Sequence, residues 1–382
     1  MIIYVVQPGD TIDSIASYYD IGTDSIIYNN QLSYPYRLAI GQALLLTVNA
    51  NNGNNDAEKR TVVSGGYAYP FIRRFTLTET LPYLTDLFVF SYGFTTEGEL
   101  IPPSLDDTWM IELALMNNTR PILTLTPFGK DGQFSNYLIN VLVNSPSIQE
   151  NLIDNLLGTM SGKNYGGIDI DFEYILAEDK IAFSQFVERV RIAANKAGYP
   201  VSVALAPKTS DDQPGLLYGG KDYRLLGEAA NHVLLMTYEW GYTYGPPMAV
   251  APLNQVRRVV EYALTQIPAE KIDLGIPNYG YDWPLPYVKG TTKATTINNV
   301  QAVRIAVENG AEIHFDDVAE SPYFTYTENG VEHEVWFEDV RSLLAKFELI
   351  KEYGLRGCGY WQIMQWFRAN WLLLKDQFYI LK

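Results

Sequence analysis

The sequence contains few of the residues that disulfides and metal sites require. Of its 382 residues, one is cysteine and three are histidine. The single cysteine, Cys358, allows no disulfide within the chain, and its place in an expected strand predicts a buried, inert thiol. The histidines, His232, His314 and His333, are scattered without the spacing of metal ligands. We therefore predict no metal site and no cofactor.

Positive charge is also scarce. Lysine and arginine number 28 against 44 aspartates and glutamates, which gives a formal net charge of -16 and a pI near 4.6. This balance argues against nucleic acid and against anionic membrane surfaces as partners. Binding to any anionic polymer would have to depend on stacking and hydrogen bonds, because electrostatic steering would oppose it.

Long apolar runs are absent as well. No segment reaches the roughly 18 apolar residues that a membrane span needs, and the chain opens on a strand-like run without the charged and apolar regions of a signal peptide. We expect that a signal was removed or never existed. Hydrophobic residues make up 47% of the chain, which is enough for a sizeable core and for two domains.

Three acids alternate with apolar residues in Gly-Ile-Asp-Ile-Asp-Phe-Glu, residues 167–173. A period of two places Asp169, Asp171 and Glu173 on one face of a strand. Acids on a core strand are costly to bury and repel one another, which indicates a function unless the strand is half-exposed and the acids are solvated. Burial and repulsion raise the pKa of at least one of them, and a carboxyl that keeps its proton is what a general acid needs. Glu173 is the candidate.

The order of the acids along the strand predicts different roles. Strands rise roughly 3.3 Å per residue, so Asp171 lies about 6.6 Å from Glu173 along the backbone and Asp169 about twice as far. Asp171 can therefore contact Glu173, whereas Asp169 can act only through Asp171.

This run resembles the signature Asp-x-x-Asp-x-Asp-x-Glu of glycoside hydrolase family 18, which ends the fourth strand of a (β/α)8 barrel. Asp169, Asp171 and Glu173 match its last three acids, while the first position holds Gly166. The outermost acid of the family's relay is therefore absent. We expect an α/β fold, a (β/α)8 TIM barrel, with these three acids as catalytic residues.

Three later runs resemble other strand ends of the same family. Met-Thr-Tyr-Glu at 236–239 resembles the family's Met-x-Tyr-Asp. The resemblance implies that Tyr238 hydrogen-bonds the substrate's acetamido group. It also places Glu239 where the family usually has an aspartate, which is one methylene shorter. The run at 274–280 resembles the sixth or seventh strand end of these barrels and makes Tyr279 a candidate substrate contact. The run at 359–362 resembles the eighth strand end, which implies that Trp361 forms the floor of the sugar site. Two further substrate-binding candidates are Tyr67 and Tyr92. Each aromatic run, taken alone, is more typical of core packing than of a site, but the order of the runs after the acidic motif favours the site.

The resemblance also implies the reaction, because this family is a substrate-assisted exception among glycosidases. Glu173 would protonate the leaving oxygen while the 2-acetamido carbonyl attacks its own anomeric carbon. Asp171 and Tyr238 would hold the resulting ion, and Glu173 would then act as base for water, with retention. The substrate must carry an N-acetyl group, which points to polymers of N-acetylglucosamine such as peptidoglycan or chitin.

Residues 1–48 resemble a LysM domain, a βααβ unit that binds such glycans. Gln-Pro-Gly-Asp-Thr at 7–11 begins the resemblance, and Thr11 stands where it would cap a helix. A second helix around 24–30 and a closing strand over 42–47 complete the unit. By resemblance, the glycan-binding candidates are two groups of three residues, Gly9, Asp10 and Thr11 and then Asn30, Gln31 and Leu32. For Pro8 and Gly9 a role in the turn alone is an equal alternative.

The remaining chain divides into a linker and the barrel. Residues 49–60 are polar and predict a flexible linker, which leaves 61–382 for the catalytic domain. Candidate barrel strands begin near residues 61, 87, 121, 167, 201, 233, 272 and 357, and helical spacing covers 180–197 and 256–267. The catalytic domain exceeds the roughly 250 residues typical of the fold, so we expect an α+β insertion over about 281–341, with a hairpin at Asn329-Gly330. Within it Trp283, Tyr323 and Trp336 could touch sugar or simply pack the core.

Three functions stay open at this point. One is an N-acetylglucosaminidase that cleaves β-1,4 bonds in peptidoglycan, with the LysM domain holding it on the wall. Its domain order and missing signal resemble spore cortex-lytic enzymes of endospore-forming bacteria, which implies the spore coat, cortex or cell wall as its location. The second is a chitinase or chito-oligosaccharide hydrolase. The third is a non-catalytic glycan-binding coat protein, against which the retention of Glu173, Asp171 and Tyr238 counts.

Overall fold

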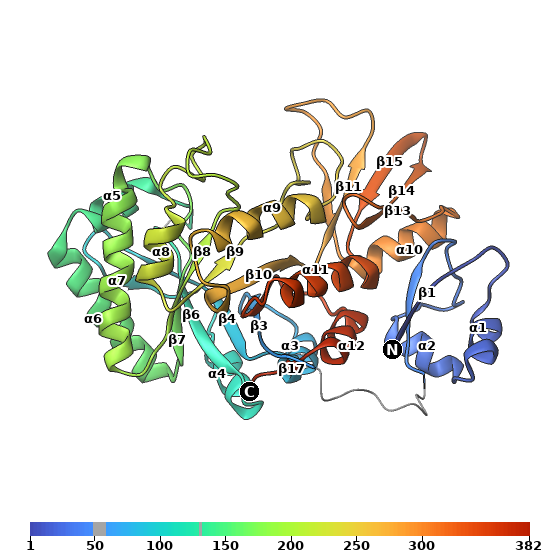
Figure 1. The fold of residues 1–382 in the computed structure, drawn as a ribbon, viewed down its shortest axis with the longest axis horizontal. Coiled ribbons are helices and arrows are strands. Elements are labelled where there is room, and N and C mark those ends of the chain that lie inside the picture. Colours follow the sequence, from blue (N-terminus) through green and yellow to red (C-terminus); the bar gives the residue numbers. More distant parts are fainter. Residues whose placement is uncertain (49–58, 130–131) are drawn as a thin grey trace.

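A computed structural model describes residues 1–48, 59–129 and 132–382 (Figure 1). Most of the linker expected at 49–60 lies outside these residues. The described strands form three sheets: a pair near the N-terminus, a large sheet that closes into a barrel, and a five-stranded sheet.

Eight parallel strands form the barrel, in the order in which they follow one another along the chain. They are β3 (Thr61–Ala68), β4 (Asp86–Phe94), β6 (Arg120–Leu125), β7 (Gly167–Ile170), β8 (Val201–Leu205), β9 (His232–Leu235), β10 (Ile272–Pro277) and β16 (Gly357–Trp361). All eight begin within one residue of the predicted positions. The (β/α)8 fold class is therefore confirmed.

The barrel closes where β3 pairs with β4 on one side and with β16 on the other, with Val63 opposite Gly357. Two short strands extend the sheet: β5 (Leu100–Ile101) pairs with the end of β4, and β17 (Tyr379–Ile380) pairs with the start of β3. The first barrel strand is thus held by segments from the far end of the sequence.

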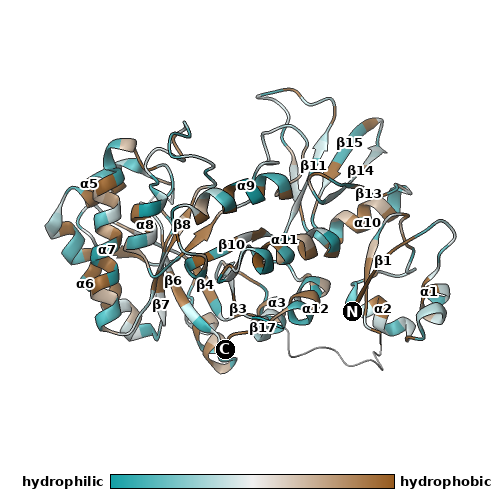
Figure 2. Ribbon diagram, viewed as in Figure 1, coloured by the Kyte–Doolittle hydropathy of each residue, from teal (hydrophilic) through white to brown (hydrophobic). Residues whose placement is uncertain are grey.

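Helices surround the barrel, and their apolar residues face the strands (Figure 2). The α-helices are α3 (Arg74–Thr80), α4 (Thr108–Met116), α5 (Asn136–Val143), α6 (Pro146–Lys163), α7 (Lys180–Lys196), α8 (Tyr223–Ala229), α9 (Leu253–Leu264), α11 (Val340–Glu352) and α12 (Arg368–Gln377). Three short 3-10 helices are η2 (Leu81–Tyr83), η3 (Ala177–Asp179) and η4 (Ala269–Lys271). The prediction for 180–197 is confirmed to one residue. Helix α9 lies three residues earlier than predicted at both ends, because Pro252 precedes its start and Pro268 disfavours helix at Ile267.

The expected insertion forms a five-stranded antiparallel sheet with one helix before the last barrel strand. Its elements are β11 (Gly280–Pro284), β12 (Thr295–Ile297), α10 (Asn299–Asn309), β13 (His314–Asp316), β14 (Ser321–Glu328) and β15 (Val331–Trp336). Asn329 and Gly330 both have positive φ and join β14 to β15, as predicted. The side chain of Trp283 is fully buried, and Tyr323 stacks on Trp336 at 4.6 Å between ring centroids, so these aromatic residues pack the insertion and its contact with the barrel.

The N-terminal unit, residues 1–48, has the predicted βααβ order. It consists of β1 (Ile2–Val5), α1 (Ile12–Tyr19), α2 (Thr23–Asn29) and β2 (Ala43–Leu46), and β1 pairs antiparallel with β2. Thr11 caps α1 through a reciprocal capping box with Ser14, as its position predicted. A small apolar core that includes Ile15, Ile26 and Leu44 holds the unit together.

The N-terminal unit lies against α12 and the insertion (Figure 1). Arg368 donates from its backbone N–H to Oε1 of Gln31 at 2.7 Å, and its guanidinium lies over the ring of Tyr28 at 4.2 Å. On the insertion side, Ile313 donates to the carbonyl of Ile40 at 2.8 Å. Gly41 is required beside this contact, because a Cβ there would lie 1.8 Å from the carbonyl oxygen of Ile313.

A fully buried ion pair joins the barrel to the insertion. Nζ of Lys346 on α11 lies 2.8 Å from Oε2 of Glu338, which follows β15, and both side chains are 0% exposed.

Replacing Lys346 by Met would leave the Glu338 carboxyl buried without its partner. We expect Lys346→Met to lower the free energy of unfolding by about 3–5 kcal/mol, measured by urea denaturation. Arg224→Met, which removes an exposed helical pair with Glu228, is the control and should change it by less than about 0.5 kcal/mol; equal effects of the two substitutions would contradict this prediction.

Candidate active site

A cavity of about 610 Å³ opens at the carboxyl ends of the barrel strands. It contains two of the three signature acids and an aromatic wall. Its lining residues are Tyr67, Tyr69, Phe90, Phe128, Phe134, Asp171, Glu173, Ala204, Leu234, Met236, Tyr238, Glu239 and Trp361. This end of a (β/α)8 barrel is where such enzymes place their active sites.

The acidic run continues its alternation beyond the strand. Strand β7 ends at Ile170, so only Asp169 belongs to it, although the backbone N–H of Asp171 still donates to Leu125. Phe172 points the opposite way and stacks on Phe183 of α7. The predicted strand is therefore too long, but the predicted division of side chains between two faces is correct.

Asp169 is buried in the barrel and accepts two hydroxyl hydrogen bonds. Tyr67 on β3 donates at 2.8 Å and Ser202 on β8 donates at 2.6 Å. Burial raises the pKa of Asp169, while these two hydrogen bonds lower it. Sequence reasoning missed Ser202, whose only signal was its place in a strand otherwise made of apolar residues.

Asp171 and Glu173 are the acids that reach the cavity. Burial, followed by repulsion from Glu173 and Asp169, raises the pKa of Asp171 well above its usual range. Burial also raises the pKa of Glu173, and the nearby charge of Lys221 lowers it. Oδ1 of Asp171 is buried without a hydrogen-bond partner in the described structure. Two carboxyls of raised pKa therefore line the same cavity, and one of them has an oxygen that no described group contacts.

Tyr238 and Glu239 follow β9 and also line the cavity. Glu239 has a φ of 68° and accepts hydrogen bonds from the hydroxyls of Tyr279 and Tyr281. Tyr279 does not line the cavity itself, so its contact with this site runs through Glu239. Tyr281 was missed by sequence reasoning, because it belongs to the insertion.

Trp361, at the end of β16, lies among aromatic rings. Its ring centroid is 5.0 Å from that of Phe90 and 5.6 Å from that of Tyr67. Tyr69, Phe90, Phe128 and Phe134 were not predicted as site residues. Their only signal in the sequence is that they lie in or beyond barrel strands, a position they share with many core aromatic residues.

Tyr92 does not belong to this cavity, which corrects its prediction as a substrate contact. Its hydroxyl donates to Asp107 at 2.6 Å, and its ring packs against Tyr165 behind the strands. The pairing of β4 with β6 shifts register between Val89 and Tyr92. This irregularity turns Tyr92 away from the barrel interior, and Phe90 lines the cavity in its place.

Gly166, at the position of the first signature acid, is closely packed. A Cβ there would lie 2.5 Å from Cγ of Arg120. Arg120 in turn pairs with Asp86, with Nε and Oδ1 2.7 Å apart. An acid at position 166 would therefore require Arg120 to move.

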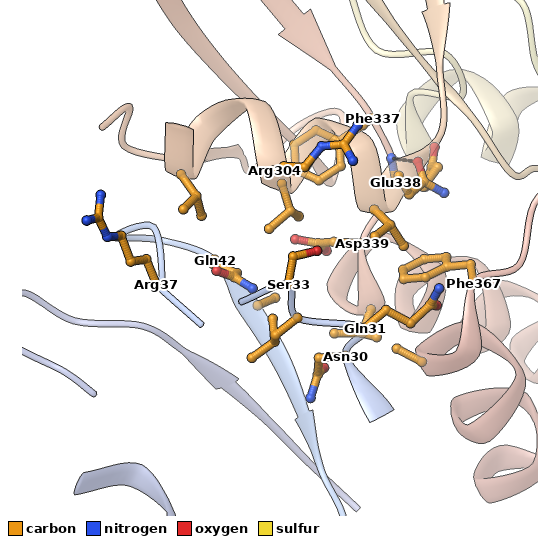
Figure 3. A pocket seen from close by; sticks show the side chains of 18 residues that line it. Asn30, Gln31, Ser33, Arg37, Gln42, Arg304, Phe337, Glu338, Asp339 and Phe367 are labelled. Carbon is orange, nitrogen blue, oxygen red and sulfur yellow. Dashed lines mark hydrogen bonds between the residues drawn. The ribbon is translucent and has the colours of Figure 1, made fainter. Parts of the chain in front are cut away.

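The six glycan-binding candidates of the N-terminal unit do not line one common pocket. Asn30, Gln31 and Leu32 line a cavity of about 660 Å³ between this unit, α10, and the starts of α11 and α12, whereas Gly9, Asp10 and Thr11 do not (Figure 3). Some of these residues also make structural contacts: Asn30 bonds to both backbone groups of Leu45, and Asp10 accepts from Tyr4. As a glycan site this set stays a prediction.

No three histidine, cysteine, aspartate or glutamate side chains in the described ranges gather as metal ligands would. No helix within those ranges combines the length and apolarity needed to cross a membrane. Cys358 is buried, and burial raises the pKa of its thiol to about 12.

Comparison with known proteins gives two family matches. The model of glycosyl hydrolases family 18 matches residues 121–365, and the LysM domain model matches residues 4–47. The cortical fragment-lytic enzyme of Bacillus subtilis is 37% identical over 432 residues, which cover 100% of this chain and 99% of that protein.

Solved structures give the same picture over the full length. The crystal structure of the Bacillus megaterium spore cortex-lytic enzyme SleL matches with a TM-score of 0.93 and 34% identity, covering 100% of this chain and 98% of that one. The spore cortex-lytic enzyme SleL of Bacillus cereus matches with a TM-score of 0.93 and 33% identity, covering 100% of this chain and 99% of that one. A chitinase from Chromobacterium violaceum, at 24% identity and a TM-score of 0.76, shares the fold.

The hydroxyl of Tyr67 has a measurable electrostatic role. Tyr67→Phe removes one of the two donors to Asp169 and should raise the pKa of that carboxyl further. Because a raised carboxyl pKa loses stability as pH rises, we expect the variant to lose about 1–3 kcal/mol of unfolding free energy at pH 8 and less at pH 5, measured by denaturation at both values. Tyr69→Phe, in the same cavity, is the control, since its hydroxyl makes no hydrogen bond among the described residues. A loss independent of pH would refute the assigned interaction.

Proposed function

Because the chain belongs to family 18 of the glycosyl hydrolases, and is therefore a glycoside hydrolase, we propose that it is an N-acetylglucosaminidase that cleaves the β-1,4 bonds of spore cortex peptidoglycan. The full-length relatives carry names that describe lysis of cortex or of cortical fragments. Their coverage of both the barrel and the N-terminal unit supports transfer of that substrate class to this chain.

The observation that carries the proposal is the pairing of Glu173 with Asp171 in one cavity. Burial raises the pKa of Glu173 and so favours its protonated form, which is the form that can donate to a leaving oxygen. Beside it, Oδ1 of Asp171 is buried and has no partner within the described structure. An acetamido N–H of the substrate is a donor of the kind this oxygen requires.

The reaction then proceeds without a second catalytic carboxylate on the opposite face of the sugar. Glu173 gives its proton to the glycosidic oxygen as the bond from that oxygen to the anomeric carbon breaks. The acetamido carbonyl oxygen forms a new bond to the same carbon, and Asp171 and Tyr238 hold the resulting cation. Glu173, now a carboxylate, takes a proton from water as the water oxygen bonds to the anomeric carbon and the bond from that carbon to the acetamido oxygen breaks. This step restores the protonated Glu173 and retains the anomeric configuration.

The aromatic residues and Glu239 would position the sugar. Trp361 offers an apolar face for the sugar ring, and Tyr67 fixes Asp169 behind the reacting group. Tyr279 orients Glu239 from outside the cavity. These roles follow from placement in the cavity and from the family's motifs together.

The division of labour along the chain is part of the same proposal. Residues 1–48 would bind N-acetylglucosamine-containing glycan and hold the enzyme on the cortex or wall. Residues 49–60 would link this domain to the catalytic domain. The catalytic domain would span residues 61–382, with the insertion at about 281–341. The LysM match over residues 4–47 supports the first assignment. The spore cortex is then the place of action, as the names of the relatives suggest.

The proton donor can be tested by one substitution. Glu173→Gln keeps the shape of the side chain but cannot transfer a proton, so we expect turnover to fall by at least about 10²-fold. Sedimentation with insoluble cortex should stay unchanged. Glu178→Gln, an exposed neighbour in η3, is the control and should keep wild-type turnover. Near-wild-type turnover in Glu173→Gln would refute the role of Glu173.

The substrate can be tested by mass spectrometry of the products. Wild-type protein and Glu173→Gln are incubated with cortex muropeptides and, separately, with chito-oligosaccharides. We expect cortex fragments that end in reducing N-acetylglucosamine, which are absent with the variant. Cleavage of chito-oligosaccharides alone would make the protein a chitinase, and binding without any product would make it a glycan-binding protein.

A further inference from the structure

A cavity of about 660 Å³ between the N-terminal unit and the catalytic domain takes no part in the reaction described above (Figure 3). One wall is formed by the loop after α2 and the start of β2. The other walls are α10 and the segments that begin α11 and α12. None of its lining residues also lines the active-site cavity. It is therefore a separate place at which a ligand could bind.

Gln42 leaves a hydrogen-bond donor free in this cavity. The residue is 2% exposed, and its Oε1 accepts from the backbone N–H of Ala39 at 3.1 Å. That bond fixes which end of the amide is oxygen, so Nε2 is the end that has no partner in the described structure. Figure 3 shows this nitrogen on the side of Gln42 that faces Ser33. Because buried polar groups are normally hydrogen-bonded, the nitrogen requires an acceptor that the chain does not supply.

The charged residues of the lining leave positive charge uncompensated. Glu338 and Asp339 are buried, and each pairs with a cation outside the lining, at nitrogen–oxygen distances of 2.8 Å and 2.7 Å. The two cations of the lining, Arg37 and Arg304, are exposed. Arg37 has no ion pair or hydrogen bond from its guanidinium in the described structure, and Nε of Arg304 lies 3.9 Å from Oε1 of the exposed Glu308. The cavity therefore favours an anion.

Aliphatic side chains make up much of the remaining lining. Val300, Val303 and Val307 recur at helical spacing on one face of α10 and are half-buried. Leu32 and Val340 add to this apolar surface from the N-terminal unit and from α11. A carboxylate on a short aliphatic chain complements the set, because its oxygens accept from N–H donors and its alkyl part packs against the valines.

We propose that this cavity binds a carboxylate carried on a short aliphatic chain, with Gln42 and Arg37 as its polar contacts. Peptidoglycan offers that group at two places, the carboxyl end of an alanine-containing stem peptide and the lactyl group of muramic acid. The choice of peptidoglycan as its source rests on the proposed function, whereas the preference for a carboxylate rests on the lining alone. A ligand held here contacts both domains, so it stabilises their docked arrangement.

The test is calorimetric titration of the full chain with three probes. They are N-acetyl-D-alanyl-D-alanine, its C-terminal amide, and N-acetylmuramic acid. We expect at least one of the two acids to bind with a Kd of about 1 mM or below, as suits a small ligand with few contacts. The amide should bind at least about tenfold more weakly than the dipeptide acid, because it lacks the charge.

The two acids distinguish the sources of the carboxylate. Binding of the dipeptide acid assigns the cavity to the stem peptide, and binding of N-acetylmuramic acid alone assigns it to the lactyl group. Binding of neither acid at about 10 mM would overturn the proposal. Displacement of a bound acid by chito-oligosaccharide would also overturn it, because the cavity would then belong to a glycan groove of the N-terminal unit.

Two variants test the assigned contacts. Gln42→Glu keeps the oxygen that accepts from Ala39 but replaces the free donor by a second oxygen, so we expect at least about tenfold weaker binding. Arg37→Met should weaken binding about fivefold or more. Arg189→Met removes an exposed arginine of α7, at the opposite end of the molecule in Figure 1, and should keep the wild-type affinity. Equal affinities of Arg37→Met and Arg189→Met would overturn the proposal, and since Arg37 is exposed this comparison stands even if Gln42→Glu does not fold.

Thermal unfolding gives a second readout. A saturating concentration of the bound acid should raise the Tm of the wild type and of Arg189→Met, and should raise that of Arg37→Met less. An equal rise in all three proteins would count against the site. Neither readout requires cleavage, so failure of the wild type to cleave cortex fragments would count against the proposed function and not against this cavity.

Discussion

The burial of several like charges at one end of the barrel is the constraint on which the rest of the site depends. Asp169 and Asp171 are almost inaccessible, and Glu173 and Glu239 line the same cavity as Asp171. Each charge that is withdrawn from water must be compensated by hydrogen bonds or by a cation. Asp169 accepts hydrogen bonds from two hydroxyls and Glu239 from two tyrosines, and the positive charge of Lys221 lowers the pKa of Asp171 and Glu173.

The compensating groups come from elements far apart in the sequence. Tyr67 lies on β3, Ser202 on β8, Lys221 in the loop after β8, and Tyr281 in the insertion. Only closure of the barrel and docking of the insertion bring them to the acids. Fold and chemistry are thus coupled, because neither the acids nor their partners could stay buried without the other.

This separation explains what the sequence could predict and what it could not. The eight strands, the βααβ unit, the Asn329-Gly330 turn and the face of the acidic run follow from local periodicity and turn residues, and the structure has them. The prediction of Tyr92 as a substrate contact was wrong, because a shift in strand pairing carries no signal in the residues themselves. Ser202 and Lys221 were missed because nothing in their local sequence shows which side chains from other strands they will meet.

The N-terminal unit shows the same limit at the level of whole elements. Its own pattern predicted its elements correctly, but not that Gln31 would bond to Arg368 or that Gly41 would lie against Ile313. Such contacts depend on a second surface that only the assembled barrel and insertion provide. A motif can thus identify a domain while leaving open which of its faces is occupied.

The pairing of β3 with β16 also bears on the order of events during synthesis. Val63 meets Gly357, so the first barrel strand keeps an unpaired edge until the last strand has left the ribosome. Contacts between segments so distant in sequence form slowly, and an exposed apolar strand edge invites pairing with other chains. The nascent chain therefore presents this edge for most of the time it takes to translate, which makes β3 the segment where a chaperone would have most to protect.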